Sequence, residues 1–278
     1  MTTHLLLIDC PDEKGLVYRI TAELFRHDFN IISNHEFVDA STEHFFMRTA
    51  FAGAGSPTEM VGELRKSLPS GASVRLTAAE RRPIVILATR EPHCLGDLLL
   101  RHAYDELPAR ICAVVSNHET LAPLVAKFDI PFHYVSHVGL EREQHEQEIL
   151  AVLRRYTPDY LVLAKYMRVL TPQFVAQFPN RIINIHHSFL PAFMGANPYR
   201  QAFERGVKII GATAHLVTDD LDTGPILVQD VLHVDHSLGP ADMAQAGRDV
   251  EKLVLSKALK LVLEERVFLH DKRTVIFE

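Results

Sequence analysis

The sequence predicts an α/β protein in which a ferredoxin-like domain is followed by a doubly wound, mostly parallel sheet. Three observations lead to this prediction. Apolar runs of strand length recur between amphipathic helical patterns along the 278 residues. In residues 1–80 these elements follow the order βαββαβ, whereas in residues 83–278 single strands and helices alternate. The charged stretch at 79–83, with the sequence AERRP, separates the two patterns as a linker.

The first domain is predicted from short apolar runs that polar turns interrupt. The helical pattern after the first run has a predicted buried face that consists of Val17, Ile20, Leu24 and Phe25. An Asp-Ala-Ser-Thr turn joins two later runs, which indicates an antiparallel hairpin. A second helix precedes the last strand, and the predicted strands are 4–8, 31–38, 43–51 and 73–77. This order of elements is that of a ferredoxin-like sandwich.

The first strand leads into the segment DCPDEKGLVYRI, in which an acidic residue and a glycine precede a helix. The segment resembles the small-ligand regulatory family known as ACT, where Asp-x-x-Gly-Leu/Val opens the first helix. Asp12, Gly15 and Leu16 occupy these positions here. The resemblance covers residues 1–80 and implies an amino-acid effector, such as glycine or methionine, near these three residues. It also implies a homo-oligomer formed by ACT pairing. The alternative is a domain that only stabilises the fold.

The second domain is predicted from a succession of single strands and helices. The predicted strands are 84–88, 111–116, 132–135, 160–164, 182–185 and 274–277, and the predicted helices are 121–128, 140–156, 172–178 and 241–265. Such alternation predicts a parallel sheet with helices on both faces. Because ligands bind these sheets at the carboxyl ends of the strands, we expect the functional site there.

One predicted strand of the second domain ends in polar residues that suit acyl chemistry. Asn184 and His186 lie two positions apart in the run INIHHS, so a continuing strand would project both side chains from one face. An amide N–H can stabilise a developing oxyanion, and an imidazole can move protons near neutral pH. The strand end therefore predicts a catalytic amide and imidazole.

A second polar cluster follows further along the chain. Thr213, His215 and Val217 alternate on one face of another strand. Three carboxylates crowd the next turn, namely those of Asp219, Asp220 and Asp222. A carboxylate aimed at an imidazole fixes the orientation of the ring and favours its protonated form. Asp219 and Asp220 can equally be solvated turn residues.

Both clusters together resemble the folate-dependent formyltransferase family, which carries Asn-Ile-His-x-Ser-Leu-Leu-Pro and, downstream, His-x-Val-x-x-x-x-Asp-x-Gly-Pro. The resemblance spans residues 83–278 and implies that Asn184, His186 and Asp222 are catalytic. It also implies a pterin site formed by the loop after 160–164 and by the acidic turn. The substrate-binding residues that it implies are Tyr166, Met167, Arg168, Val169, Leu170, His187, His215, Thr218 and Asp219.

The loop after the strand at 84–88 bears on the acceptor of the formyl group. Family members that formylate glycinamide ribonucleotide have a Gly-Asn-Gly-Ser-Asn loop there, whose N–H groups cradle a phosphate. This chain has Arg-Glu-Pro-His-Cys, in which Pro92 lacks an N–H and Glu91 repels phosphate. Water is the simplest remaining nucleophile. The ACT-like domain and the pair His186 and His187 resemble the deformylase branch, which implies hydrolysis of 10-formyltetrahydrofolate to formate and tetrahydrofolate.

Other interpretations remain open at this stage. The second enzymatic hypothesis is formyl transfer to an unidentified amine, and a non-enzymatic one is a folate or amino-acid sensor. Transfer to methionyl-tRNA is disfavoured by the order of the domains. Zinc bound by His186, His187 and His215 has no supporting closed ligand motif, so we expect no metal and no permanently bound cofactor. His187 either lines a water pocket or shapes its loop, and Arg168 contacts either the folate glutamate tail or solvent.

The composition is that of an ordinary globular protein, with 47% hydrophobic and 23% charged residues. A net charge of −6 with scattered basic residues argues against a nucleic-acid partner. Three cysteines without a CxxC pair indicate reduced thiols, and no apolar run is long enough for a membrane span. We therefore expect a cytoplasmic enzyme without membrane or nucleic-acid partners, whose formate supplies purine biosynthesis and balances the one-carbon pool.

Overall fold

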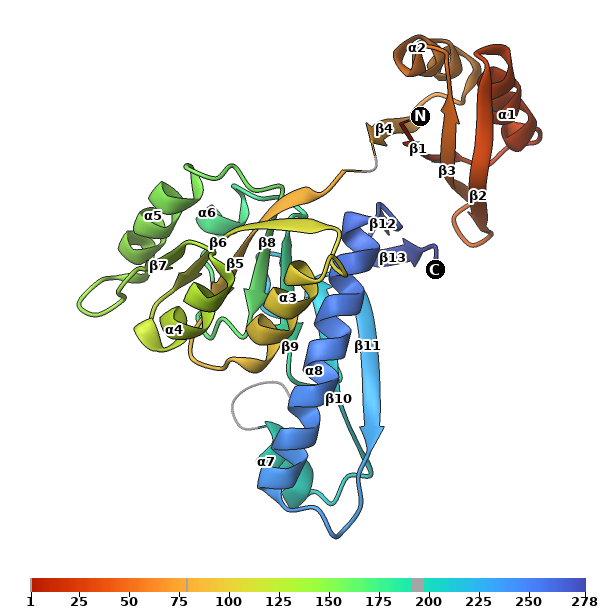
Figure 1. Ribbon diagram of the computed structural model, residues 1–278. Coiled ribbons are helices and arrows are strands. Elements are labelled where there is room, and N and C mark those ends of the chain that lie inside the picture. The colour runs from red at the N-terminus through yellow and green to blue at the C-terminus, as the bar shows by residue number, and fades with distance from the viewer. Residues whose placement is uncertain (1, 79, 192–197) are drawn as a thin grey trace. The chain divides into compact units, whose positions relative to one another are not determined.

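The computed structural model describes residues 2–78, 80–191 and 198–278 (Figure 1). The chain divides into two compact units, and each is described by itself. The first unit comprises Met1–Glu80, Glu264–Phe268 and Val275–Glu278, and the second comprises Arg81–Leu263 and Leu269–Thr274. Among the described helices, none is long and apolar enough to cross a membrane.

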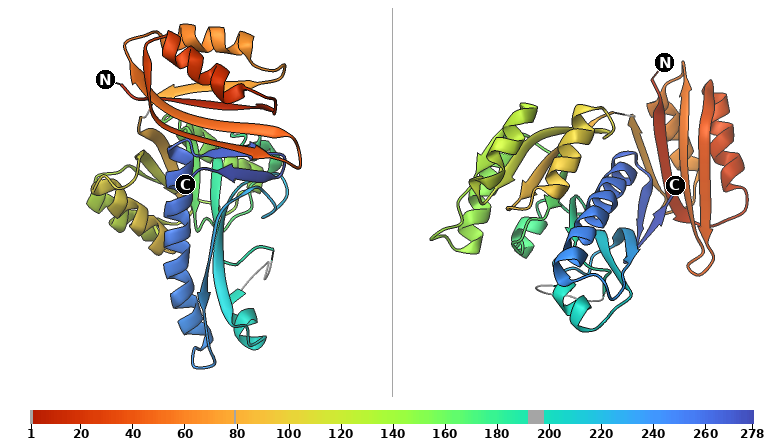
Figure 2. Two further views of the ribbon diagram at one scale, coloured as in Figure 1. Left: turned by 90° about the vertical axis from the view of Figure 1, so that its right-hand side faces the viewer. Right: turned by 60° about the horizontal axis from the view of Figure 1, so that its bottom comes forward.

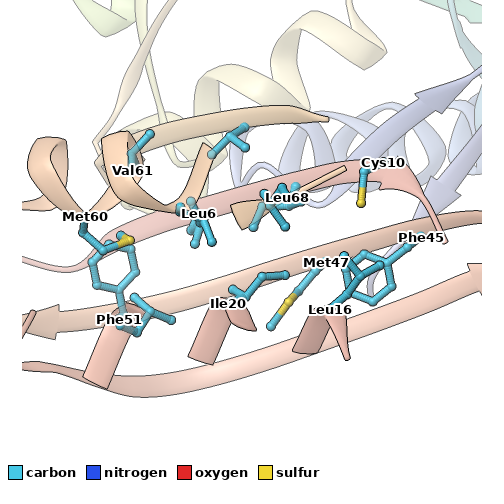
Figure 3. Packing of buried hydrophobic residues seen from close by; sticks show 14 of the residues in the cluster. Leu6, Cys10, Leu16, Ile20, Phe45, Met47, Phe51, Met60, Val61 and Leu68 are labelled. Carbon is cyan, nitrogen blue, oxygen red and sulfur yellow. The ribbon is translucent and has the colours of Figure 1, made fainter. Parts of the chain in front are cut away.

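The first unit contains a four-stranded antiparallel sheet in the order β2-β3-β1-β4. Its elements are β1 (His4–Pro11), α1 (Leu16–Arg26), β2 (Phe29–Asp39), β3 (His44–Gly53), α2 (Pro57–Ser67) and β4 (Ser73–Ala78). The predicted order βαββαβ is therefore confirmed. Figure 2 shows both helices on the same face of this sheet. Between helices and sheet lies an apolar core that includes Leu6, Ile20, Met47, Phe51 and Met60 (Figure 3).

Helix α1 buries a face that differs in part from the predicted one. The helix begins after Gly15, whose φ of +90° is a left-handed conformation that glycine adopts without strain. Its buried side chains are those of Leu16, Ile20, Glu23 and Leu24. The prediction was wrong for Val17, which is 39% exposed, and for Phe25, which is 84% exposed. The stripe follows the i, i+4 spacing from residue 16, so residues one position later turn away from the sheet.

The second face of the N-terminal sheet is also apolar, and the C-terminal residues cover it. Phe268 and Phe277 form a cluster with Leu5, Leu7 and Phe46 of this sheet. Strands β12 (Val267–His270) and β13 (Arg273–Ile276) pair with each other. The sequence assigned all of 83–278 to the second domain, whereas part of this C-terminal segment clusters with the first unit. The physical reason is that an exposed apolar sheet face needs a covering layer.

The second unit is built on a seven-stranded sheet in the order β11-β10-β9-β8-β5-β6-β7. Its strands are β5 (Arg82–Ala88), β6 (Ala109–Ser116), β7 (Phe132–Tyr134), β8 (Tyr160–Ala164), β9 (Ile182–His186), β10 (Ile209–Leu216) and β11 (Ile226–His233). Strands β5 to β9 pair in parallel, whereas β10 and β11 are antiparallel. The prediction of a mostly parallel sheet is confirmed.

Helices cover this sheet on both faces. They are α3 (His93–Ala103), α4 (Ala122–Val125), α5 (Arg142–Leu153), α6 (Pro172–Val175), α7 (Pro198–Glu204) and α8 (Pro240–Leu263). Val85 and Leu87 pack in one cluster with residues of α5 and α6. Ile84 and Ile86 alternate with them along β5 and are also fully buried, so the opposite face is covered too. Helices α3 and α8 lie against each other in front of the sheet (Figure 1).

The predicted helix at 121–128 has an irregular form. It consists of a 3-10 turn (Glu119–Leu121), α4, and a second 3-10 turn (Ala126–Phe128). The predicted helix at 140–156 is shorter than expected and corresponds to α5. Neither difference alters the path of the chain through the sheet.

The strand order reverses beside β5. The chain first adds β6 and β7 on one side of β5 and then adds β8 and β9 on the other. Parallel neighbours β5 and β8 therefore end side by side, and the loops that leave them diverge. This is the position at which doubly wound sheets bind ligands. The loop after β8 and the end of β9 are the segments that the sequence associated with folate.

Candidate active site

The two polar motifs meet because their strands pair directly. Strands β9 and β10 are antiparallel, with Asn184 opposite His215 and His186 opposite Thr213. Residues opposite each other in a sheet project their side chains from the same face. The Nδ2 atom of Asn184 accordingly lies 3.2 Å from Nε2 of His215. Pairing of two strands therefore brings the amide and both imidazoles to one place.

Asp222 joins this group from the turn after β10. Its φ of +54° lies in the left-handed region, and Gly224 follows in the same turn. A Cβ atom at Gly224 would lie 1.8 Å from the carbonyl oxygen of Leu216, so only glycine fits there. The turn aims the carboxylate between two rings. Its Oδ2 atom lies 3.2 Å from Nδ1 of His186, and its Oδ1 atom lies 3.5 Å from Nε2 of His215.

The two ring nitrogens of His186 have different surroundings. Burial would raise the pKa of Asp222, but hydrogen bonds and charge from His186 and His215 outweigh it and hold that pKa well below its ordinary value. Asp222 is therefore ionised at neutral pH and accepts a hydrogen bond from Nδ1–H of His186. In the described part of the chain, the buried Nε2 of His186 has no hydrogen-bond partner. That nitrogen is therefore available to a ligand of the cavity.

His215 links the amide to the carboxylate. Its Nδ1 atom lies 2.9 Å from the carbonyl oxygen of Leu216 and donates to it. A neutral ring then accepts the Asn184 amide N–H at Nε2, whereas a protonated ring donates from Nε2 to Asp222. The second N–H of the Asn184 amide stays available for a ligand in the first case. His187 lies beside this group, with its ring stacked 5.0 Å from that of His186.

One cavity of about 460 Å³ contains these groups. Three segments form it: the loop after β8, the end of β9 and the turn after β10. All residues predicted as catalytic or substrate-binding line it, namely Tyr166, Met167, Arg168, Val169, Leu170, Asn184, His186, His187, His215, Thr218, Asp219 and Asp222. The cavity also includes Leu163, Lys165, Ile185, Val217 and Leu221, which the sequence did not single out. The geometry brings the predicted residues together, and their roles stay predictions.

The cavity wall combines apolar and polar surfaces. The side chains of Met167, Val169 and Leu221 line it and are exposed. Asn184, His186 and Asp222 supply hydrogen-bonding groups at its inner end. Exposed apolar side chains beside converging polar groups are typical of small-molecule sites. The arrangement suits a small molecule that combines apolar surface with polar groups.

Sequence reasoning missed a second charged cluster in the same unit. Glu251 on α8 is 1% exposed, and its carboxylate accepts from three side chains. Its oxygens lie 2.7 Å from Nε2 of His93, 3.2 Å from Nζ of Lys165 and 2.7 Å from the hydroxyl of Tyr199. A signal was present: Glu251 is a charged residue on the mostly apolar buried face of α8. An acid on the buried face of a helix is rarely placed there without partners.

The structure also bears on metal binding. Among the described residues, His93, Cys94 and Glu251 form the group whose ligand atoms lie within 4.8 Å of one another. Burial, with Glu251 next, raises the pKa of the Cys94 thiol far above its ordinary range, so that thiol is protonated. Glu251 already accepts from three donors. The three histidines considered for zinc are not among the groups found in the described residues.

The residues predicted to bind an effector lie at the start of α1 in the first unit. The backbone N–H of Asp12 donates to the carbonyl oxygen of Glu43 at 2.7 Å. Gly15 precedes the helix in a left-handed conformation. The side chain of Leu16 is buried in the core of this unit (Figure 3). Only Asp12 and Gly15 are therefore placed to meet a ligand at the surface, and their role stays a prediction.

Comparison with known proteins agrees with this geometry. The formyl transferase family model matches residues 82–259. The formyltetrahydrofolate deformylase of Escherichia coli strain K12 is 58% identical over 96% of this chain and 95% of its own. The Haemophilus influenzae protein of the same name is 53% identical over 98% of each chain. The chain belongs to the formyltetrahydrofolate deformylase family.

Solved structures extend the comparison with the family. A formyltetrahydrofolate deformylase from Pseudomonas syringae pv. tomato superimposes with a TM-score of 0.95 and 40% identity, over 100% of this chain and 95% of that one. Glycinamide ribonucleotide transformylase 1 from Symbiobacterium toebii gives a TM-score of 0.69 and 28% identity. That match covers 76% of this chain and 100% of the transformylase. The deformylases therefore match the whole chain, whereas the transformylase matches only part of it.

Proposed function

We propose that the protein hydrolyses 10-formyltetrahydrofolate to formate and tetrahydrofolate. The observation that carries this proposal is the buried Nε2 atom of His186, which has no hydrogen-bond partner among the described residues and belongs to a ring that lines the cavity beside Asn184 and Asp222. Membership of the deformylase family supports the same reaction. The substrate enters as a ligand of the cavity, and no step requires a resident cofactor.

The proposed reaction begins with water near the Nε2 atom of His186. Nε2 removes a proton as the water oxygen attacks the formyl carbon, and the Asn184 amide donates to the oxyanion that forms. The resulting imidazolium is stabilised by Asp222, 3.2 Å from Nδ1. His186 then gives the proton to N10 of the folate, and the C–N bond breaks. Formic acid leaves and ionises, so one imidazole carries one proton from water to the leaving amine.

The pKa of Asp222 assigns the base in this proposal. A carboxyl group held well below its ordinary pKa is a weak base at neutral pH. Asp222 therefore orients His186 and stabilises its charged form, and His186 accepts the proton. An active site built on Asp222 as the base would need a carboxyl with a raised pKa, which is the opposite of the direction found.

The loop after β8 supplies the proposed pterin site. Tyr166 to Leu170 line one wall of the cavity, and Thr218 and Asp219 line another. Apolar side chains can cover the faces of the pterin, while backbone groups and the acidic turn meet its polar edge. Arg168 stands at the same wall, where a guanidinium suits the carboxylates of the glutamate tail.

The loop after β5 supports water rather than a phosphorylated amine as acceptor. Pro92 occupies the N-cap position of α3 and offers no N–H to an anion. The carboxylate of Glu91 lies 3.5 Å from Nδ1 of His93 in the first turn, which adds negative charge where a phosphate would bind. Transfer to an unidentified amine without a phosphate is the alternative.

The decisive experiment is incubation of the purified protein with 10-formyltetrahydrofolate and no amine. We expect stoichiometric formate and tetrahydrofolate, measured by a coupled formate assay and by absorbance. An Asn184→Asp variant, which keeps the size but replaces the amide donor by an acceptor, should lose about 100- to 1,000-fold in kcat. Formate that appears only when an amine is added would support the transferase alternative instead.

We further propose that the first unit is an ACT-type regulatory domain that pairs with a second copy and binds an amino acid near Asp12 and Gly15. Exposed apolar side chains support pairing: Tyr18, Phe25, Ile32, Phe37 and Val38 lie on α1 and on the edge strand β2. Phe25→Glu should shift the mass measured by light scattering towards the monomer. A wild-type protein that is already monomeric at micromolar concentration would contradict this proposal.

A further inference from the structure

The loop that lines the cavity has no regular secondary structure of its own. Strand β8 ends at Ala164 and α6 begins at Pro172, and the intervening residues 165–171 are in neither helix nor strand. Lys165 to Leu170 nevertheless line the cavity. A loop without the backbone hydrogen bonds of a helix or sheet loses conformational entropy when a ligand orders it. Contacts from other elements decide whether it is ordered beforehand.

At its first residue the loop is tied to α8. Lys165 has a φ of +59°, a left-handed conformation that few residues with a side chain adopt. Its ammonium lies 3.2 Å from the carboxylate of Glu251, and the two side chains are 5% and 1% exposed. Despite burial, these donors lower the pKa of Glu251 to about 2, with His93 and Lys165 as the main causes. The carboxylate is therefore ionised at neutral pH, and its contact with the Lys165 side chain ties the backbone turn to α8.

At its last residue the loop is tied to α5 by a second buried glutamate. The backbone N–H of Thr171 donates to Oε1 of Glu146 at 2.8 Å, and the Thr171 hydroxyl donates to Oε2. The same hydroxyl accepts the N–H of Phe174 and caps α6. Glu146 is 4% exposed. One carboxylate thus fixes both the end of the loop and the start of the next helix.

A third tie lies between these ends. The backbone N–H of Met167 donates to the hydroxyl of Thr89, the residue that follows β5, at 3.0 Å. The side chain of Met167 itself lines the cavity and is exposed. The loop is therefore held at its two ends and near its middle, while the side chains that face the cavity remain uncovered.

We propose that Glu251 and Glu146 are positioning residues that hold the cavity-lining loop 165–171 in its substrate-binding shape before the substrate arrives. The inference rests on the proposed function only in taking 10-formyltetrahydrofolate as the substrate. Neither glutamate lines the cavity, so each acts through a loop residue, Lys165 or Thr171. Their loss leaves the proton-transfer group intact and raises the entropy that binding must remove.

Three variants test this proposal. Glu251→Gln removes the charge that pairs with Lys165, and the double variant Glu251→Gln/Lys165→Met removes both charges so that no unpaired charge stays buried. Glu146→Met removes both acceptors of Thr171 at similar volume. Glu23→Gln is the matched control, because Glu23 is a buried glutamate paired with Arg26 in the first unit.

Two measurements are made on each protein. Hydrogen exchange of peptides across 165–171 in the free protein should rise in the three variants and stay at the wild-type rate in Glu23→Gln. For hydrolysis of 10-formyltetrahydrofolate by Glu251→Gln and Glu146→Met, whose substituted residues lie outside the cavity lining, KM should rise about tenfold while kcat stays within about threefold. The double variant should regain global stability yet keep the fast local exchange, which separates loop positioning from folding.

Unchanged exchange across 165–171 in the double variant and in Glu146→Met would overturn the proposal. A fall in kcat with an unchanged KM would also overturn it, because that pattern places the glutamates in the chemistry. If the wild-type protein releases no formate, the proposed function fails. The exchange measurement, made without substrate, still decides the positioning role in that case.

Discussion

Asp222 and Glu251 are two carboxylates of the same unit, with side chains 14% and 1% exposed, and they differ in what their imidazole partners face. Each has a lowered pKa because imidazole and other donors outweigh the effect of burial. Around Glu251, an imidazole, an ammonium and a phenol all donate to the carboxylate. Beside Asp222, His186 uses Nδ1 for the carboxylate, and its buried Nε2 has no hydrogen-bond partner among the described residues. The Nδ1 atom of His93 in the Glu251 cluster also lacks a hydrogen bond there, but it lies 3.5 Å from the carboxylate of Glu91, and His93 does not line the cavity.

The difference indicates that the Asp222 site is built to bind a ligand, whereas the Glu251 cluster holds parts of the fold together. A buried polar atom without a hydrogen bond typically lowers the stability of the folded protein by about 1–3 kcal/mol. The Nε2 atom of His186 is such an atom among the described residues, and the contact of Nδ1 with Asp222 does not satisfy it. Such an atom persists where a ligand completes it. In the Glu251 cluster the carboxylate accepts from three side chains, which ties together the elements that supply these donors. Three ways to test this comparison follow, from the largest expected effect to the smallest.

The largest effect is expected when the proton-transferring ring is replaced. In His186→Gln, the side-chain amide can still donate to Asp222, but it cannot accept a proton from water. We expect kcat for formate release to fall about 1,000-fold, within the range known for general acid–base groups, with KM nearly unchanged. His133→Gln is the matched control, since His133 pairs with Tyr156 outside the cavity. Near-wild-type turnover in His186→Gln would show that His186 does not transfer the proton.

The Asp222 cluster could be predicted from the sequence, whereas only the buried acid Glu251, and not its partners, left a signal there. Alternation along one strand placed Asn184 and His186 on a common face, and the motif resemblance added Asp222. The tie between Glu251 and Lys165 joins a helix to a loop far away in the sequence, so no local pattern encodes it. Only the packing of α3, α7, α8 and the loop after β8 brings those donors together.

The same limit explains the differences in the first unit. Helical spacing predicted that α1 has one buried face. Because apolar residues also occupy neighbouring positions, the spacing did not decide which of them belong to that face. Phe25 was therefore assigned to the core although it is exposed. The single predicted C-terminal strand, 274–277, was assigned to the second domain by sequence order, whereas Phe268 and Phe277 pack on the N-terminal sheet. Periodicity predicts elements and faces, but it does not predict which layer covers a face.

An intermediate effect is expected in acid. The pKa of Glu251 is about 2 in the folded protein and 4.5 ordinarily, so its ionised form stabilises the fold above pH 4.5. This contribution, about 3 kcal/mol, is lost as the pH falls from 4.5 towards 2, because the unfolded chain binds the proton more readily. Urea unfolding, measured at half-unit pH steps, gives the free energy of unfolding at each pH. Between pH 4.5 and 2 this free energy should fall more steeply with decreasing pH for wild type than for Glu251→Gln/Lys165→Met.

Exposed Glu63 provides the control for the acid measurement. It forms a surface pair with Lys66, so Glu63→Gln should follow the wild-type pH dependence. The same pH dependence in wild type and in the Glu251 double variant would mean that the carboxylate gains nothing from its donors. Glu251 would then not be a carboxylate that stabilises the fold through its donors, and the contrast with Asp222 would be wrong.

The smallest effect concerns Cys94, which lies next to Glu251 and is almost fully buried. Burial, followed by the charge of Glu251, raises the pKa of this thiol, and alkylation requires the thiolate. In the folded protein at pH 8, iodoacetamide should label Cys94 at least tenfold more slowly than in urea, as followed by peptide mass spectrometry. Equal rates in both states would show that water and reagent reach the Glu251 cluster. A cluster open in that way could not hold Lys165 by a desolvated charge pair, and the loop would then need another source of order.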